Sequence, residues 1–186
     1  MKNAHEADPY DLESLLYLGI SSTNELEQAA ALKHLTNWLR YHPDFCSLPI
    51  LSKEGDLDLD EVENAFNEAT ALKPSDTQVL TSLGVLQFIR RDFNKASVYF
   101  EKAIKENPID HSVWNKYGAA LANSMRTEEA KSAYQQALEL RPNYVRTLVN
   151  IGLAHNNQGE YLKASELFLN ALVLNPKAEH IWSYLR

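Results

Sequence analysis

The stretch TQVLTSLGVLQFIRRDFNKASVYFEKAIKENP (residues 77–108) decides the fold, because its pattern recurs twice further along the chain. The two later copies are HSVWNKYGAALANSMRTEEAKSAYQQALELRP (111–142) and VRTLVNIGLAHNNQGEYLKASELFLNALVLNP (145–176). Each copy starts 34 residues after the one before it. A period of this size predicts a chain built from stacked helical units.

Small and large side chains occupy fixed positions in each unit. The eighth position is glycine, the twenty-fourth is aromatic and the thirty-second is proline: Gly84, Phe100 and Pro108; Gly118, Tyr134 and Pro142; Gly152, Phe168 and Pro176. Apolar residues at helical spacing, with small residues opposite large ones, favour two antiparallel helices that approach closely. The proline ends the second helix, because it has no N–H and restricts the residue before it.

This is the pattern of the tetratricopeptide repeat, and it predicts an all-α superhelix, an α-solenoid of antiparallel helix pairs. The expected divisions are 1–10 as the end of a preceding repeat, 11–43 as a repeat, 44–76 as an irregular repeat or hinge, 77–110, 111–144 and 145–178 as repeats, and 179–186 as the start of a following helix. The irregular unit has CSLPILSKEGDLDLDE (46–61) in place of a first helix. Apolar positions at both ends predict a piece of a longer array, able to self-associate through those ends.

Composition narrows the class of protein. The chain has 186 residues, 45% of them hydrophobic and 23% charged, which is typical of a soluble folded protein. We expect no membrane span, because the apolar stretches are far shorter than the roughly 20 residues that a spanning helix needs. The absence of a secretory signal and the single cysteine favour the cytoplasm.

The net charge is unevenly distributed along the chain. Residues 1–76 hold 5 Lys/Arg and 15 Asp/Glu, a charge of −10, whereas residues 77–186 hold 13 and 10, a charge of +3. The total of −7 argues against a nucleic-acid partner, because such binding depends on cations that neutralise phosphates. Any anion-binding site is therefore expected in the second half.

An enzyme is the least favoured class. Cys46 has no nucleophile context, the six histidines lack metal-ligand spacing, and no glycine-rich phosphate loop is present. We expect no catalytic residues, no metal site and no cofactor.

The candidate binding residues come from the inner wall of the array. The repeat resemblance implies that positions 2, 5, 6, 9, 12 and 13 of each first helix line this concave wall. The predicted peptide-binding residues on it are Asn24, Asn115, Lys116, Asn123, Arg146, Asn150 and Asn157, with Thr23 as a weaker candidate. Amides bind an extended backbone without reading its side chains. Arg146 and Asn150 are four residues apart on one helical face, so they can converge on one anion.

These positions predict a groove for a peptide with a free carboxylate, which is a known recognition mode. Two simpler interpretations stay open at this point. In the first interpretation, the asparagines at position 13 cap the turn inside each unit. In the second, Lys116 and Arg146 are ordinary solvated charges.

Five segments together resemble the family of peroxisomal targeting signal receptors that read C-terminal Ser-Lys-Leu signals. They are WNKYGAALAN (114–123), YVRTLVNIG (144–152), HNNQG (155–159), STNELEQ (22–28) and LTNWLRYHP (35–43). A Ser-Lys-Leu tail is an address read by a receptor, which agrees with a soluble binding protein.

The resemblance implies a role for each candidate residue. Asn24 contacts the signal, Asn115 and Asn123 bind the peptide backbone, and Lys116 lies near the carboxylate. Arg146 serves the carboxylate directly or through water, while Asn150 and Asn157 supply the remaining polar contacts. The implied partners are the C-terminal peptides of peroxisomal cargo, with the peroxisomal docking machinery bound through segments absent from this chain. The implied location is the cytoplasm, with cycling to the peroxisomal membrane.

Two other binding functions compete with this one. A chaperone-cofactor clamp for acidic tails uses a lysine followed one turn later by asparagine, but Ala120 stands at that offset from Lys116. A generic repeat scaffold would instead hold a helix or tail of another protein on the same inner face.

Overall fold

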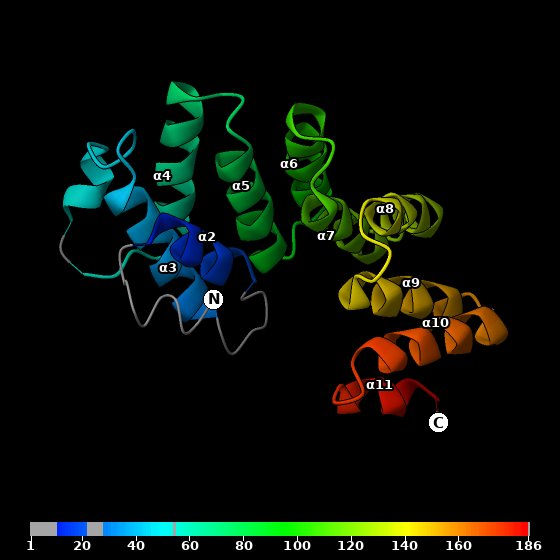
Figure 1. The fold of residues 1–186 in the computed structure, drawn as a ribbon. Helices are drawn as coiled ribbons and strands as arrows, with labels where there is room; N and C mark the ends of the chain where they lie inside the picture. Colours follow the sequence, from blue (N-terminus) through cyan, green and yellow to red (C-terminus); the bar gives the residue numbers. More distant parts are fainter. Residues whose placement is uncertain (1–10, 22–27, 54, 186) are drawn as a thin grey trace. The chain divides into compact units, whose positions relative to one another are not determined.

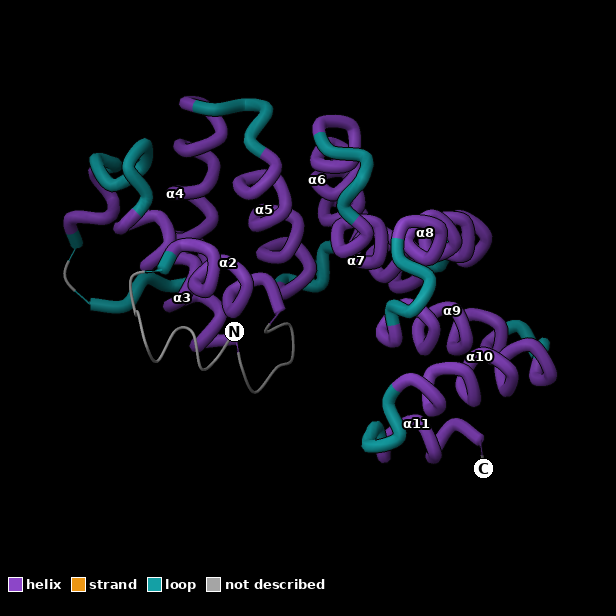
Figure 2. Tube along the Cα trace, viewed as in Figure 1, coloured by secondary structure: helices purple, strands orange, loops and turns teal. Residues whose placement is uncertain are grey.

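The computed structural model describes residues 11–21, 28–53 and 55–185 of the chain. Within these ranges every regular element is a helix, and Figure 2 shows the helices joined by loops and turns. The chain divides into two compact units, residues 1–106 and 107–186, which are described separately below. The predicted all-α class of paired helices is confirmed.

The first unit contains five α-helices and one short 3₁₀ helix in its described part. They are α2 (Leu12–Ser21), α3 (Gln28–Tyr41), η2 (Pro49–Ser52), α4 (Leu59–Leu72), α5 (Thr77–Ile89) and α6 (Phe93–Glu106). Helix α2 packs against α3, and α5 packs against α6, as the repeat pattern predicts for helix pairs. The residues expected to end a preceding helix, 1–10, lie outside the described ranges.

The irregular segment replaces a first helix but still supplies core side chains. Phe45, Leu48 and Leu51 are buried in one cluster with Trp38 and Phe66. The rings of Trp38 and Phe66 are stacked, with their centroids 5.9 Å apart. The segment therefore buries apolar surface from turns and the short η2 helix, and the hinge motion expected of it stays a prediction.

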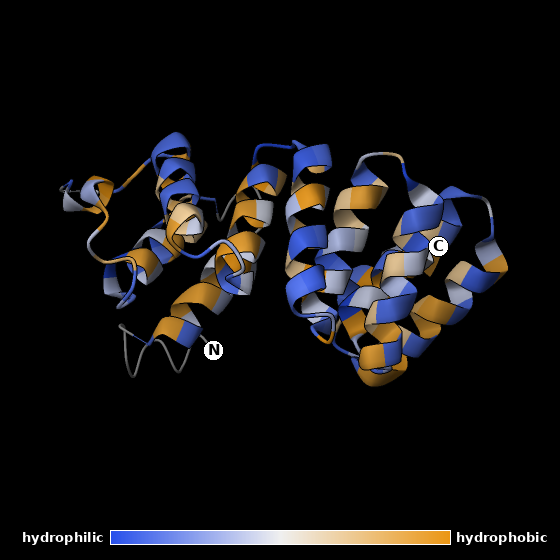
Figure 3. Cartoon of the chain, turned by 90° about the horizontal axis from the view of Figure 1, so that it is seen from above, coloured by the Kyte–Doolittle hydropathy of each residue, from blue (hydrophilic) through white to orange (hydrophobic). Residues whose placement is uncertain are grey.

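The second unit carries the repeats that decided the fold. Its elements are α7 (His111–Asn123), α8 (Thr127–Leu140), α9 (Val145–Asn157), α10 (Tyr161–Leu174), the four-residue α11 (Glu179–Trp182) and the 3₁₀ helix η3 (Ser183–Leu185). In Figure 1, α9 and α10 lie side by side, and the contacts pair α7 with α8 and α9 with α10. Figure 3 shows hydrophobic and hydrophilic residues alternating along these helices, as expected of amphipathic elements.

The glycine and aromatic markers meet inside each helix pair. A Cβ atom added to Gly118 would lie 2.6 Å from the Tyr134 ring, and one added to Gly152 would lie 2.7 Å from the Phe168 ring. Tyr134 and Phe168 are both buried. The two helices of a pair therefore approach so closely that only glycine fits at the eighth position.

The prolines and aspartates of the repeat set the ends of the helices. Helices α8 and α10 stop two residues before Pro142 and Pro176. Helix α7 begins after Asp110, whose side chain accepts hydrogen bonds from the backbone N–H groups of Ser112 and Val113 at 2.8 and 3.3 Å. This is an N-cap, which satisfies donors that the first turn leaves unpaired.

Candidate binding site on helices α7 and α9

The structure places six of the eight predicted residues on two first helices of the second unit. Asn115, Lys116 and Asn123 belong to α7, and Arg146, Asn150 and Asn157 belong to α9. The other two, Thr23 and Asn24, lie outside the described residues. On α9 the three residues are 4 and 11 positions apart, so they form one stripe along the helix. We call the six residues the α7–α9 wall.

Asn115 joins the two helices of the wall. Its Oδ1 accepts a hydrogen bond from Thr147 Oγ1 at 2.9 Å and another from Asn150 Nδ2 at 3.1 Å. Asn115 is only 3% exposed and Thr147 is fully buried. Among the described residues both hydrogen bonds of Asn115 use its oxygen, and its amide nitrogen has no partner there.

Lys116 is half-buried next to a second cation. Its Nζ donates to Ser112 Oγ at 2.9 Å, one turn earlier on α7. Burial, and after it the positive charge of Arg146, lower the pKa of Lys116 to about 8, while Asp110 acts in the opposite direction. Two like charges that disfavour each other in this way create a place where an anion is stabilised.

Arg146 is the exposed member of the cation pair. The described part of the chain shows no carboxylate in ion-pair contact with it. Its guanidinium carries several donors in a fixed fork that matches the geometry of a carboxylate. The wall therefore offers one half-buried point charge and one exposed fork.

The two asparagines at the helix ends have different surroundings. Asn123 is exposed, and its Nδ2 donates to the backbone oxygen of Ala119 at 2.8 Å, so this amide bonds to its own last turn. Asn157 is exposed, and the described residues show no hydrogen bond from its side chain. The turn-capping interpretation thus describes Asn123 better than Asn157.

Three polar residues that support the wall were not among the candidates. Thr147 and Ser112 hold Asn115 and Lys116, and Asp110 faces Lys116. Ser112 stands four residues before Lys116, a spacing that the sequence itself displays. The bond from Thr147 crosses 32 residues of chain, so only a structure reveals it.

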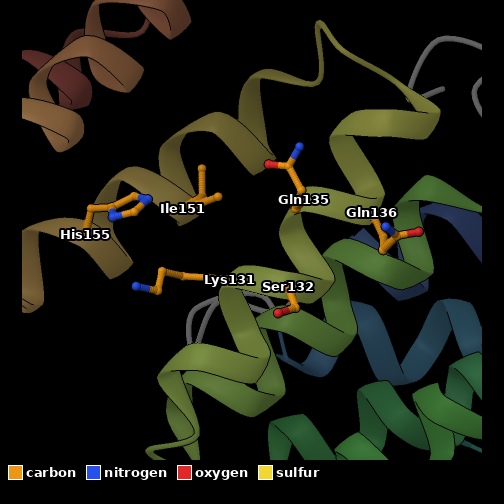
Figure 4. A pocket seen from close by; sticks show the side chains of 6 residues that line it. All are labelled: Lys131, Ser132, Gln135, Gln136, Ile151 and His155. Carbon is orange, nitrogen blue, oxygen red and sulfur yellow. The ribbon is translucent and has the colours of Figure 1, made fainter.

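A separate hollow lies at α8 and α9, outside the wall. Its volume is about 470 Å³, and Figure 4 shows the six side chains that line it: Lys131, Ser132, Gln135, Gln136, Ile151 and His155. The cation of Lys131 is already paired, with Glu128 at 3.0 Å, and it also donates to Gln158 at 2.5 Å. His155 contacts Glu160 at 2.6 Å. In the hollow, Lys131 and His155 thus each contact a carboxylate already, whereas the described residues show no carboxylate in ion-pair contact with Lys116 or Arg146 of the wall.

The described residues lack two features. They contain no group of three or more His, Cys, Asp or Glu side chains able to hold a metal ion. None of the helices in these ranges is long and apolar enough to cross a membrane.

Comparisons with known proteins agree on a repeat array. The family model of the cilia and flagella-associated protein 70 middle TPR-like domain matches residues 88–183. The crystal structure of MamA aligns with 96% of this chain and 86% of its own, with a TM-score of 0.63 and 19% identity, a likeness in fold alone.

Two curated relatives carry names from peroxisome biology. The peroxisomal targeting signal receptor of Eremothecium gossypii is 36% identical over 173 residues, which are 91% of this chain and 30% of that protein. Peroxisome biogenesis protein 5 of Arabidopsis thaliana is 47% identical over 101 residues, which are 54% of this chain and 14% of that protein. The chain thus spans less than a third of the length of these relatives.

The helix pairs, the matched family and the relatives lead to one assignment. The repeats of this chain form an interaction array and not an enzyme. The matched family is a repeat domain, and the relative from Eremothecium gossypii is a receptor by name. The chain belongs to the tetratricopeptide-repeat family, as a TPR-like domain related in sequence to the peroxisomal targeting signal receptors.

Proposed function

We propose that the chain binds C-terminal peptides of the Ser-Lys-Leu type on the α7–α9 wall, as the cargo-reading part of a peroxisomal import receptor. The observation that carries this proposal is the cation pair. Lys116 is held half-buried beside Arg146 at a pKa of about 8, which costs free energy in the absence of an anion. The α-carboxylate of a peptide is an anion small enough to contact both cations.

The amides beside the cation pair support a peptide over a small acid. Asn115 leaves its nitrogen for a ligand, and Asn150 leaves its oxygen, since its own nitrogen is bonded to Asn115. An extended peptide backbone presents both an acceptor and a donor in each residue. From Arg146 to Asn157 the stripe is roughly 16 Å long at 1.5 Å per helical residue, about the length of five extended residues.

The relatives support the choice of signal. The Eremothecium gossypii protein is named for a peroxisomal targeting signal, and its matched part covers 91% of this chain. We infer that Thr23 and Asn24, which lie outside the described residues, also belong to the predicted peptide contacts. The whole protein would work in the cytoplasm, cycle to the peroxisomal membrane, and meet the docking machinery through segments other than this one.

Fluorescence anisotropy with two peptides tests the proposal. One peptide ends in a free Ser-Lys-Leu carboxylate, and the other has the same sequence with a C-terminal amide. We expect the acid to bind at least tenfold more tightly, because the amide leaves the half-buried Lys116 and the exposed Arg146 without an anionic partner. Equal binding of both peptides to the folded chain would overturn the carboxylate site.

A third peptide separates this function from the chaperone-cofactor alternative. It ends in a run of acidic residues with a free carboxylate. Tighter binding of this acidic tail than of Ser-Lys-Leu would favour the chaperone-cofactor clamp. We expect Ser-Lys-Leu to bind more tightly than the acidic tail. The two cations of the wall are occupied by the α-carboxylate, and its other predicted members are neutral amides that do not attract acidic side chains.

A further inference from the structure

Behind the α7–α9 wall, a buried hydroxyl decides how two amides of the wall are turned. Thr147 Oγ1 and Asn150 Nδ2 both donate to Asn115 Oδ1, at 2.9 and 3.1 Å. Thr147 is 0% exposed and Asn115 is 3% exposed, so water does not replace the bond between them, whereas Asn150 is half-buried. The three side chains therefore form one network, buried at Thr147 and Asn115, that links α7 to α9.

The two ends of an amide are chemically different, because the oxygen accepts and the nitrogen donates. A concerted turn of both amides would keep the bond between Asn115 and Asn150, with donor and acceptor exchanged. The hydroxyl of Thr147 breaks this symmetry. Within the described residues Asn115 Oδ1 is the acceptor of its proton, and turning Asn115 would leave that buried proton unpaired. An unpaired buried donor is costly, so the observed orientation is favoured.

We propose that Thr147 is a positioning residue that presents the Asn115 nitrogen and the Asn150 oxygen to the ligand. The wall then offers a donor from α7 and an acceptor from α9. This pair recognises a peptide bond, whose carbonyl accepts and whose N–H donates, and it rejects an ester or an N-methylated bond at the same place. The specificity part of this inference rests on the proposed function.

The orientation itself is tested in the free protein by NMR of the side-chain amides. We expect the Asn150 amide protons to show hydrogen-bonded shifts and slowed exchange in the native chain and in Thr147→Ser. In Thr147→Val, which keeps the shape and removes the hydroxyl, both signatures should weaken as the amides turn. Unchanged Asn150 resonances in a folded Thr147→Val would overturn the inference. Thr147→Ala gives the same reading if the valine variant does not fold.

Binding measurements test the consequence. Thr147→Val should lower the affinity for the Ser-Lys-Leu peptide by about two- to tenfold, which is the net value of one hydrogen bond. Thr147→Ser should bind the peptide like the native chain. A set of peptides with one backbone N–H replaced by an ester oxygen, at each of the last three residues, gives the specific readout. The native chain should discriminate against one of these esters, and Thr147→Val should discriminate less.

The two proposals fail in different ways. Native protein that binds no peptide would overturn the proposed function, while the NMR comparison would still judge the role of Thr147. Native protein that binds the peptide, with Thr147→Val showing the same affinity and the same ester discrimination, would overturn the positioning role alone.

Discussion

Helices α5 and α7 hold the same place in successive repeats but have opposite surroundings. Ten of the thirteen residues of α5 are buried, whereas five of the thirteen in α7 are. At the sixth position α5 has the fully buried Ser82, which donates to the Gln78 backbone oxygen, and α7 has the half-buried Lys116. Inside its own unit α5 contacts α2, α4 and α6.

This comparison separates two sets of positions in one repeat. The eighth position is glycine in both helices, and an added Cβ would meet the ring of Phe100 or Tyr134 within 2.6 Å. The thirteenth position is Ile89 in α5 and Asn123 in α7. The marker positions build the helix pair, and the positions between them decide whether a first helix becomes core or binding surface.

The largest effect is expected from removing the charges that distinguish α7 and α9 from α5. Lys116→Met or Arg146→Ala should weaken the Ser-Lys-Leu acid at least tenfold, because truncating one partner of a desolvated charged contact typically costs about 2–5 kcal/mol. Fluorescence anisotropy measures the loss. Lys163→Met and Arg126→Ala, cations of the same unit outside the wall, are the matched controls and should bind normally. Equal losses in the controls would show a general charge effect in place of a site.

Substituting the glycine that α5 and α7 share at the eighth position tests whether the marker positions build the helix pair. Gly84→Ala and Gly118→Ala should each lower the free energy of unfolding by about 1–3 kcal/mol, because the added methyl group overpacks the helix pair against an aromatic ring. Urea unfolding followed by circular dichroism measures this. Gln135→Ala, at an exposed site of α8, should stay within about 0.5 kcal/mol of the native chain. A large effect at one glycine and none at the other would mean that the two pairs are built differently.

The lowered pKa of Lys116 predicts a pH dependence that α5 has no group to produce. Peptide affinity should be highest below pH 8 and fall by up to about tenfold per pH unit above it, because the neutral amine no longer attracts the carboxylate. Of the groups around Lys116, Arg146 lowers its pKa and Asp110 raises it, and burial lowers the pKa of the neighbouring His111. Anisotropy between pH 6 and pH 10 gives the profile, and Lys116→Met should flatten it.

The same group predicts a rise of stability in alkali. The unfolded lysine has a pKa of 10.5 and the folded one a pKa of about 8, so both states are protonated below pH 8 and the cost of burying the charge is fully present. Between pH 8 and 10.5 the unfolded state binds more protons, and the free energy of unfolding rises with pH. If the free energy of unfolding of Lys116→Met rose equally with pH between pH 8 and 10.5, the rise would not come from Lys116.

The smallest effect is expected at Ser112, which only supports the cation. Ser112→Ala removes the acceptor of the 2.9 Å hydrogen bond from Lys116 and should weaken the peptide by about two- to tenfold. Ser132→Ala, on α8, is the control and should leave affinity unchanged. A loss for Ser112→Ala as large as that for Lys116→Met would mean that Ser112 touches the peptide itself.

Much of the fold was predictable because the decisive contacts are close in sequence. Gly118 and Tyr134 are sixteen residues apart, helices α8 and α10 stop two residues before a proline of the repeat, and α7 begins after Asp110. The irregular segment was less predictable. Phe45, Leu48 and Leu51 reach the core from a stretch with little helical periodicity, so their burial depends on neighbours far along the chain.

The candidate site also has features that the sequence predicted and features that it did not. Periodicity alone placed Arg146 and Asn150 on one face, since residues four apart on a helix are neighbours. The near-complete burial of Asn115 and the role of Thr147 did not follow from periodicity, because the bonds between them link residues 32 positions apart.

The amino-acid sequence by itself determined the helix pairs, their period and the stripe of amides and cations, because each depends on spacing within one or two neighbouring helices. Only the tertiary structure decided which atoms of Asn115 and Asn150 are hydrogen-bonded, because Thr147, Asn115 and Asn150 meet across two helices. It also decided the charge properties of Lys116, since its pKa depends on burial and on Arg146 from another helix.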